Sequence, residues 1–100
     1  MGNGIRCVPR LPAVDARTFL GLEPTHNPNR CILPVTPGIS TRGNFLWGGC
    51  GLGAAIEAME GTTGRPVIWA TAQYLSYANP PSIMDIDVVV SNSGRSVTQA

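Results

Sequence analysis

The stretch GGCGLGAAIEAMEG, residues 48–61, decides the fold. Its larger apolar side chains recur with the period of one helix face, at Leu52, Ala55, Ile56 and Met59. Gly61 is well placed to end this helix. Many of the other positions are glycine or alanine, which lets neighbouring elements approach the helix closely. We therefore expect one central helix with a sheet wrapped around it.

Two segments after the helix have the composition of strands. Residues 67–78 are too rich in Val, Ile, Trp, Thr and Tyr for a comfortable helix, so we expect a strand there. The prolines at 80–81 end it, and residues 84–91 then alternate in a way that predicts a half-buried strand. We interpret the two strands as an antiparallel hairpin. A tight turn at residues 92–94 follows, and residues 95–100 alternate again as a further strand.

Shorter elements precede the central helix. Asp15 can cap a helix over residues 16–20, which Gly21 and Pro24 would stop. The polar residues 25–30 form a turn or loop, and residues 31–35 are a short strand closed by Pro37 and Gly38. Residues 1–13 are rich in Gly, Pro and Arg without any periodicity, and we expect an irregular leader there. The elements together predict a single α+β domain.

Composition excludes several classes of function. The chain has 100 residues, of which 43% are hydrophobic and 13% are charged, which is enough for one small core. Seven Arg, no Lys and a net charge of +1 leave no basic stripe, so we expect no nucleic acid as a partner. No stretch approaches the roughly 18 apolar residues that a membrane span needs, so we expect no membrane association. We predict a soluble domain.

The cysteines indicate a reducing compartment. Cys7, Cys31 and Cys50 are odd in number and too widely spaced for a zinc site, so we expect free thiols and no bound metal. Prolines interrupt the N-terminus where a signal peptide would need a continuous apolar run. We therefore predict a cytoplasmic protein. His26, the single histidine, lies in a polar loop and is expected to be solvated.

Five short motifs resemble the acyl-CoA thioesterases of the tandem hot-dog type, in their order and spacing. The helix entry FLWGG at residues 45–49 looks like the aromatic-Gly-Gly entry of that family. GRP at 64–66 and WATAQYLSYANP at 69–80 are similar to its second strand and the proline turn after it. DIDV at 85–88 and GRSV at 94–97 are similar to its third strand and the following turn. The resemblance covers about residues 18–100.

The resemblance implies a hot-dog fold, in which a central helix is wrapped by an antiparallel sheet. Residues 14–100 would be the N-terminal repeat, truncated within a strand, because the last segment ends unfinished. The implied activity is hydrolysis of an acyl-CoA or related thioester, without a cofactor. The family places its carboxylate, hydroxyl and Gln mainly in the second repeat. A second hot-dog repeat or another copy of the chain would therefore complete the site.

The helix entry provides the candidate substrate-binding residues. Gly48 and Gly49 lie at a helix N-terminus, where free amide groups can hold a thioester oxygen as it becomes negative. Trp47 would form a wall of the acyl or pantetheine passage, although a large aromatic at such a position is more often simply a core residue. Tyr77 shares the register of the candidate polar residues on the second strand and is expected to line the pocket.

Three polar residues are the catalytic candidates. Glu57 lies near the middle of the helix, opposite its apolar stripe, and could act as base or nucleophile. Some single-repeat relatives carry an acid on this helix one position earlier, where this chain has Ile56. Thr71 and Gln73 lie two apart on one face of the expected strand and could position a water, and the resemblance aligns Thr71 with a hydroxyl of the second repeat. Packing or solvent exposure is the competing interpretation for all three.

Other functions stay open. Residues 49–54 also fit the GxGxxA pattern of a dinucleotide-binding loop, but the preceding buried parallel strand and the later acidic residue are missing. Because few ionisable groups lie in the helix and the second strand, a non-catalytic acyl- or CoA-binding module is an alternative to a hydrolase. A purely structural half that completes a sheet is the third hypothesis.

Overall fold

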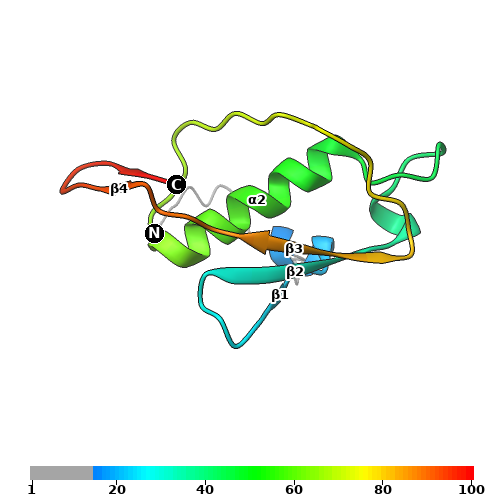
Figure 1. Ribbon diagram of the computed structural model, residues 1–100, viewed down its shortest axis with the longest axis horizontal. Coiled ribbons are helices and arrows are strands. Elements are labelled where there is room, and N and C mark those ends of the chain that lie inside the picture. The colour runs from blue at the N-terminus through cyan, green and yellow to red at the C-terminus, as the bar shows by residue number, and fades with distance from the viewer. Residues whose placement is uncertain (1–14) are drawn as a thin grey trace, which may run out of the picture.

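The computed structural model describes residues 15–100 and has one long helix packed against an antiparallel sheet (Figure 1). A three-stranded sheet has the order β1-β2-β3, and a separate pair consists of β4 and β5. This arrangement confirms the α+β class. The elements are α1 (Ala16–Leu20), β1 (Glu23–Pro24), β2 (Arg30–Val35), the 3-10 turn η1 (Pro37–Ile39), α2 (Gly48–Thr63), β3 (Ser82–Asp87), β4 (Asn92–Ser93) and β5 (Thr98–Gln99).

Helix α1 has the boundaries that its sequence predicts. The Asp15 side chain accepts a hydrogen bond from the Thr18 amide at 2.8 Å, which satisfies a free N–H group of the first turn. Gly21 adopts a left-handed conformation, and its amide donates to the carbonyl oxygens of Arg17 and Thr18. The hydrogen bond from the Thr18 backbone amide holds the pKa of the Asp15 carboxyl below its ordinary value. Both the cap and the stop are confirmed.

Strand β2 is the centre of the sheet. It pairs antiparallel with β1 on one side and with β3 on the other, so that Leu33 lies opposite Met84. Alternate side chains of β2 are buried, namely Cys31, Leu33 and Val35, as expected for a strand with one face on the core. The predicted strand over residues 31–35 is therefore confirmed.

Helix α2 buries a different face from the one its apolar pattern predicts. Ala54 and Ala58 are fully buried, with 0% of each side chain exposed, and Cys50 lies on the same face at the spacing i, i+4, i+8. The predicted stripe of Leu52, Ala55, Ile56 and Met59 is only half-buried. The face with small residues is buried because it lets the helix approach its neighbours most closely. Close approach increases the van der Waals contacts between them, which favours burying this face.

The end of α2 also differs from its prediction. The helix continues past Gly61 and ends at Thr63. Gly64 adopts a φ of 71°, a left-handed conformation that L side chains rarely adopt, and its amide donates to the Glu60 carbonyl oxygen at 2.9 Å. The helix therefore ends at the first glycine that takes this conformation.

Residues 67–78, which we call the return segment, are not a strand. They are extended and irregular, and they make no ladder with β3 or with any other strand of the described chain. The predicted hairpin is therefore wrong, because β3 pairs with β2 instead. Strand-forming composition reports how well side chains fit a half-buried pleated surface, and residues 15–100 provide no such surface next to this segment.

The remaining strands are partly as predicted. In β3 and just after it, Ile86 packs against the core and Val88 is buried, whereas Met84 and Val90 are more exposed. The final turn is two residues later than predicted, because Asn92–Ser93 pairs with Thr98–Gln99 and the Gly94 amide donates to the Val97 carbonyl oxygen. Residues 95–97 are consequently part of this turn and not of a strand.

The predictions for the cysteines and the N-terminal leader fall partly within the described residues and partly outside them. Cys31 and Cys50 are free thiols, as predicted, and the structure shows that both are buried. Cys7 and the irregular leader over residues 1–13 lie outside the described residues. No helix within residues 15–100 combines the length and apolar character needed to cross a bilayer.

The buried small face of α2 makes a testable prediction. Ala58→Leu would force three extra carbon atoms into a fully packed site, and we expect it to lower the free energy of unfolding by about 1–3 kcal/mol. Ala55→Leu makes the same chemical change at a half-buried position of the same helix and serves as the control. Urea denaturation of both variants checks this, and an equal loss in both would contradict the packing described here.

The ion pair between β2 and β3 predicts a pH dependence. Arg30 Nε lies 2.6 Å from Asp87 Oδ1, and this bond holds the pKa of Asp87 below its ordinary value of 3.8. A carboxyl group whose pKa is lower in the folded than in the unfolded protein stabilises the fold at pH values above its unfolded-state pKa. This contribution is lost as the pH falls through the folded-state pKa. Asp87→Asn should therefore be less stable than the parent at pH 7, and the difference should vanish on acidification.

Denaturation midpoints from pH 2 to pH 7 measure this difference. Asp85→Asn removes the same charge from the same strand but breaks no ion pair, so its effect should be smaller. Added salt should reduce the effect of Asp87→Asn, because both side chains are about half exposed. A difference that grows as the pH falls would have the wrong sign for this ion pair.

Candidate functional site

The return segment runs antiparallel to α2, back from its C-terminal half to its first turn. Near the C-terminal half, the Val67 amide donates to Glu60 Oε2 at 2.7 Å. At the first turn, the Tyr74 hydroxyl donates to the Gly48 carbonyl oxygen at 2.8 Å. The Leu46 amide donates to the Ala78 carbonyl oxygen at 2.7 Å, which closes the segment onto the loop before the helix. Figure 1 shows this course as the arc beside α2.

A cavity of about 530 Å³ opens between this segment and the start of α2, and we call it the tyrosine cavity. Aromatic and apolar side chains form most of its wall. Phe45 and Tyr77 meet there with their ring centroids 4.7 Å apart. The complete lining consists of Phe45, Leu46, Gly51, Tyr74, Leu75, Ser76, Tyr77, Ala78 and Met84. A volume of this size lined mainly by apolar groups suits a small apolar ligand or an acyl chain.

Two aromatic rings lie against the glycines at the helix entry. A Cβ atom at Gly49 would come within 2.9 Å of the Trp47 ring, and one at Gly48 would lie 3.3 Å from the Tyr74 ring. A side chain at residue 49 would therefore require the exposed indole of Trp47 to move. We expected these glycines to admit a substrate, but the rings of Trp47 and Tyr74 lie in the space next to them.

The first-turn amides are nevertheless available. Within residues 15–100, the structure gives no hydrogen-bond acceptor for the amide groups of Gly48 and Gly49, whereas Cys50 and Gly51 both donate to the Trp47 carbonyl oxygen. Such free amides are ordinary at the start of a helix. Gly48 and Gly49 do not line the tyrosine cavity, but Tyr74 does, and its hydroxyl donates to the Gly48 carbonyl oxygen.

The sequence-predicted site residues occupy several different places. Tyr77 lines the tyrosine cavity, although 76% of its side chain is exposed. Trp47 is the residue that precedes α2, and its side chain is 59% exposed. Glu57 is half-buried in the middle of α2. Thr71 and Gln73 are exposed on the return segment, and because that segment is not a strand, their expected common face has no structural basis.

The predicted catalytic groups do not converge. Among residues 15–100, no hydrogen bond joins Glu57, Thr71 and Gln73 to one another, and none of the three lines the tyrosine cavity. Among residues 15–100, no charged side chain lines this cavity. Within the same described range, no three His, Cys, Asp or Glu side chains gather as metal ligands would. The described lining can bind and orient a ligand, but it has no carboxylate or imidazole to act as a base.

Sequence reasoning missed the residue that organises this site, Tyr74. The prediction of a strand placed it on the face opposite to Gln73 and Tyr77, since strand side chains alternate. In the structure Tyr74 and Tyr77 line one cavity. Their spacing of three residues in the stretch YLSY, residues 74–77, was the signal available in the sequence.

Comparison with known proteins adds no identification. Neither protein-family models, nor curated proteins, nor solved structures gave a match to this chain. The function must therefore be argued from the cavity and the residues around it.

The two tyrosines of the cavity allow a matched test of its architecture. Tyr74→Phe removes the hydroxyl that tethers the return segment to α2, and we expect a loss of roughly 0.5–1.5 kcal/mol in the free energy of unfolding. Tyr77→Phe removes a hydroxyl for which the structure gives no bond within the described chain, so its stability should stay unchanged. Urea denaturation distinguishes them, and equal stabilities for the two variants would argue against the tether.

Proposed function

We propose that this chain is an acyl-CoA thioesterase-like domain, which binds the acyl group of a thioester and shares the reaction with a partner repeat. The tyrosine cavity is the observation that carries the proposal. It combines an apolar, aromatic wall with a position next to the first turn of α2. An apolar chain could fill the cavity while the thioester carbonyl lies near the free amides at the helix entry.

The arrangement of elements supports a hot-dog fold for this domain. A single long helix packs on an antiparallel sheet, and the helix begins at a Gly-Gly pair next to Trp47. The helix entry and β3 occupy the places that the thioesterase resemblance gives them, whereas residues 67–78, its expected second strand, are irregular. The catalytic groups of that family lie mainly in the second repeat, and the catalytic candidates of this chain do not converge. We therefore assign the domain as an N-terminal repeat.

The proposed reaction is hydrolysis. A water oxygen attacks the thioester carbonyl carbon, and a general base takes the water proton. The carbonyl oxygen becomes negative and is held by the amides of Gly48 and Gly49. The carbon–sulfur bond then breaks, the carboxylic acid forms, and the thiolate leaves and is protonated to free coenzyme A. This chain provides the acyl site and the amides, while the partner provides the base.

A second repeat or another copy of the chain is the proposed partner. The return segment exposes several large apolar side chains that monomeric proteins usually cover. Ile68 is 85% exposed, Trp69 is 79% exposed and Leu75 is 82% exposed. Extended backbone without ladder partners is also the form that pairs with a further strand. Both features favour association along this segment.

One observation favours a second candidate function, a non-catalytic acyl-binding module. No carboxylate lines the tyrosine cavity, and Glu57 lies elsewhere on α2. Ligand binding without turnover would be the behaviour of such a module. The two candidates share the binding site and differ only in whether a base reaches it.

A cavity-filling variant tests the shared binding site. Ala78→Leu adds bulk to the lining of the cavity, and displacing about two methylene groups of a bound acyl chain should weaken binding roughly tenfold. Ala72→Leu makes the same change on the same segment but outside the cavity and should bind as the parent does. Titration calorimetry with acyl-CoA thioesters of increasing chain length measures this, and equal binding by both variants would reject the tyrosine cavity.

Release of free coenzyme A separates the hydrolase from the module. We expect turnover only when a partner repeat is supplied, and binding without turnover by this chain alone. Turnover by the chain alone that Glu57→Gln abolishes would place the base on α2, contrary to the partner arrangement. Binding without any turnover in the presence of the partner would favour the module.

A further inference from the structure

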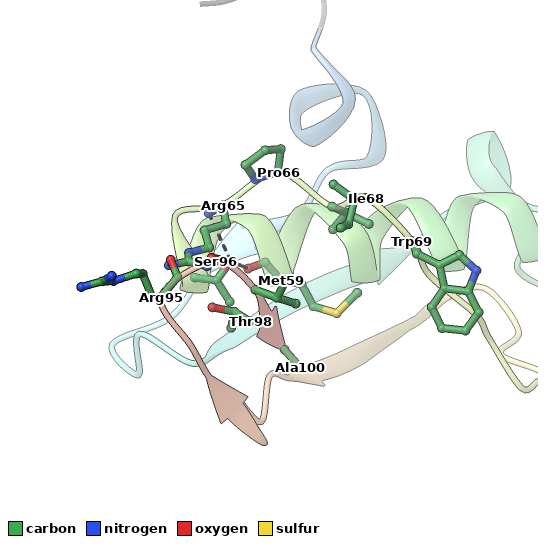
Figure 2. A pocket seen from close by; sticks show the side chains of 12 residues that line it. Met59, Arg65, Pro66, Ile68, Trp69, Arg95, Ser96, Thr98 and Ala100 are labelled. Atoms are coloured by element: carbon green, nitrogen blue, oxygen red, sulfur yellow. Dashed lines mark hydrogen bonds between the residues drawn. The ribbon is translucent and has the colours of Figure 1, made fainter.

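A second cavity, of about 310 Å³, lies at the other end of the return segment, and we call it the arginine cavity. The C-terminal half of α2, the start of the return segment and the β4–β5 turn enclose it. Figure 2 shows Arg65 turned toward the turn, Arg95 extending outward at the rim, and Trp69 at the far end of the lining. None of the site residues that the sequence predicts lines this cavity.

The polar part of the lining is positive and rich in hydrogen-bond donors. Arg65 and Arg95 both contribute to it, whereas no Asp or Glu from the described part of the chain does. Arg65 Nη2 donates to the carbonyl oxygens of Gly94 and Arg95, each at 3.0 Å, which are neutral acceptors and leave its charge uncompensated. Among residues 15–100, the single ion pair belongs to Arg30 and Asp87, so neither arginine of the cavity is paired.

Further donors lie beside the two arginines. Ser96 and Thr98 also line the cavity, and within the described chain the structure gives their hydroxyl groups no hydrogen-bond partner. Two guanidinium groups and two hydroxyls exceed what the two oxygens of one carboxylate can accept, whereas a phosphate offers more acceptor oxygens. Most of the other lining residues are apolar, among them Met59, Val97 and Trp69.

We propose that the arginine cavity binds a phosphate ester with an apolar or aromatic organic part. Arg95 and Ser96 contact the phosphate, Arg65 contributes its charge while it holds the turn in place, and the organic part extends toward Trp69. The identity of the ligand as coenzyme A rests on the proposed function. The two cavities lie at opposite ends of the return segment, near residues 51 and 59–63 of α2, which a helix separates by roughly 12–18 Å.

Coenzyme A, which carries no acyl group, tests this proposal by titration calorimetry on the full chain. Arg95→Gln should weaken its binding roughly fivefold or more, because a charge-assisted hydrogen bond at an exposed site is lost. Arg42→Gln makes the same charge change at an exposed arginine outside the cavity, and its affinity should equal that of the parent. Arg65 is left intact because it tethers the turn.

Three results would overturn the proposal. Equal weakening by Arg95→Gln and Arg42→Gln, or no binding of coenzyme A to the parent, would mean that the cavity does not hold the phosphate. Pyrophosphate that binds as tightly as coenzyme A would remove the role of the organic part. The two proposals can also fail separately. If affinity does not depend on acyl-chain length but coenzyme A still binds in a manner that requires Arg95, the proposed thioester function is rejected and the phosphate site in the arginine cavity is retained.

Discussion

The rest of the structure depends on the close packing of Ala54 and Ala58 in the core formed with β2. Both side chains are fully buried in one cluster with Leu33. Because the alanine side chain is a single methyl group, the helix axis can lie near the sheet. On the side of α1, Leu20 Cδ1 lies 3.7 Å from the position that a Cβ atom at Gly53 would occupy. A larger residue on this face would push α2 away from both neighbours.

This choice of face determines where the apolar surface of the molecule remains. With the small residues facing the core, the larger side chains of α2 are left half-buried on its other faces. The return segment passes along the same helix and is tethered to it by Glu60 and Tyr74. Both cavities are lined by this segment together with α2. The positions of the two cavities therefore depend on which face of α2 is buried in the core.

Local signals predicted the elements that depend on neighbours in sequence. Asp15 and Gly21 specify α1 through hydrogen bonds within a few residues, and the short apolar run at residues 31–35 predicts β2 as a strand. The position of α2 was predictable from its helical period, whereas its buried face depended on contacts with β2 and α1. Side-chain hydrophobicity favoured Leu52 and Ile56 for the core, but close packing favoured Ala54 and Ala58.

The errors at the site have the same physical origin. Whether residues 67–78 form a strand depends on a pairing partner, which composition does not reveal. Tyr77 was predicted as a lining residue, but Tyr74 was not, because alternation along a strand would have turned it away. The arginine cavity was not predicted, since it brings Arg65 and Arg95 together across 30 positions of the chain.

Amide hydrogen exchange on the isolated chain would show whether α2 and the sheet form the core while the return segment stays unpaired. We expect strong protection in β2, in β3 and in the second half of α2, and weak protection at most amides of the return segment, with Val67 as the exception because it donates to Glu60. Protection across residues 68–77 equal to that of β2 would contradict this arrangement, because it would mean that the return segment is paired as a strand.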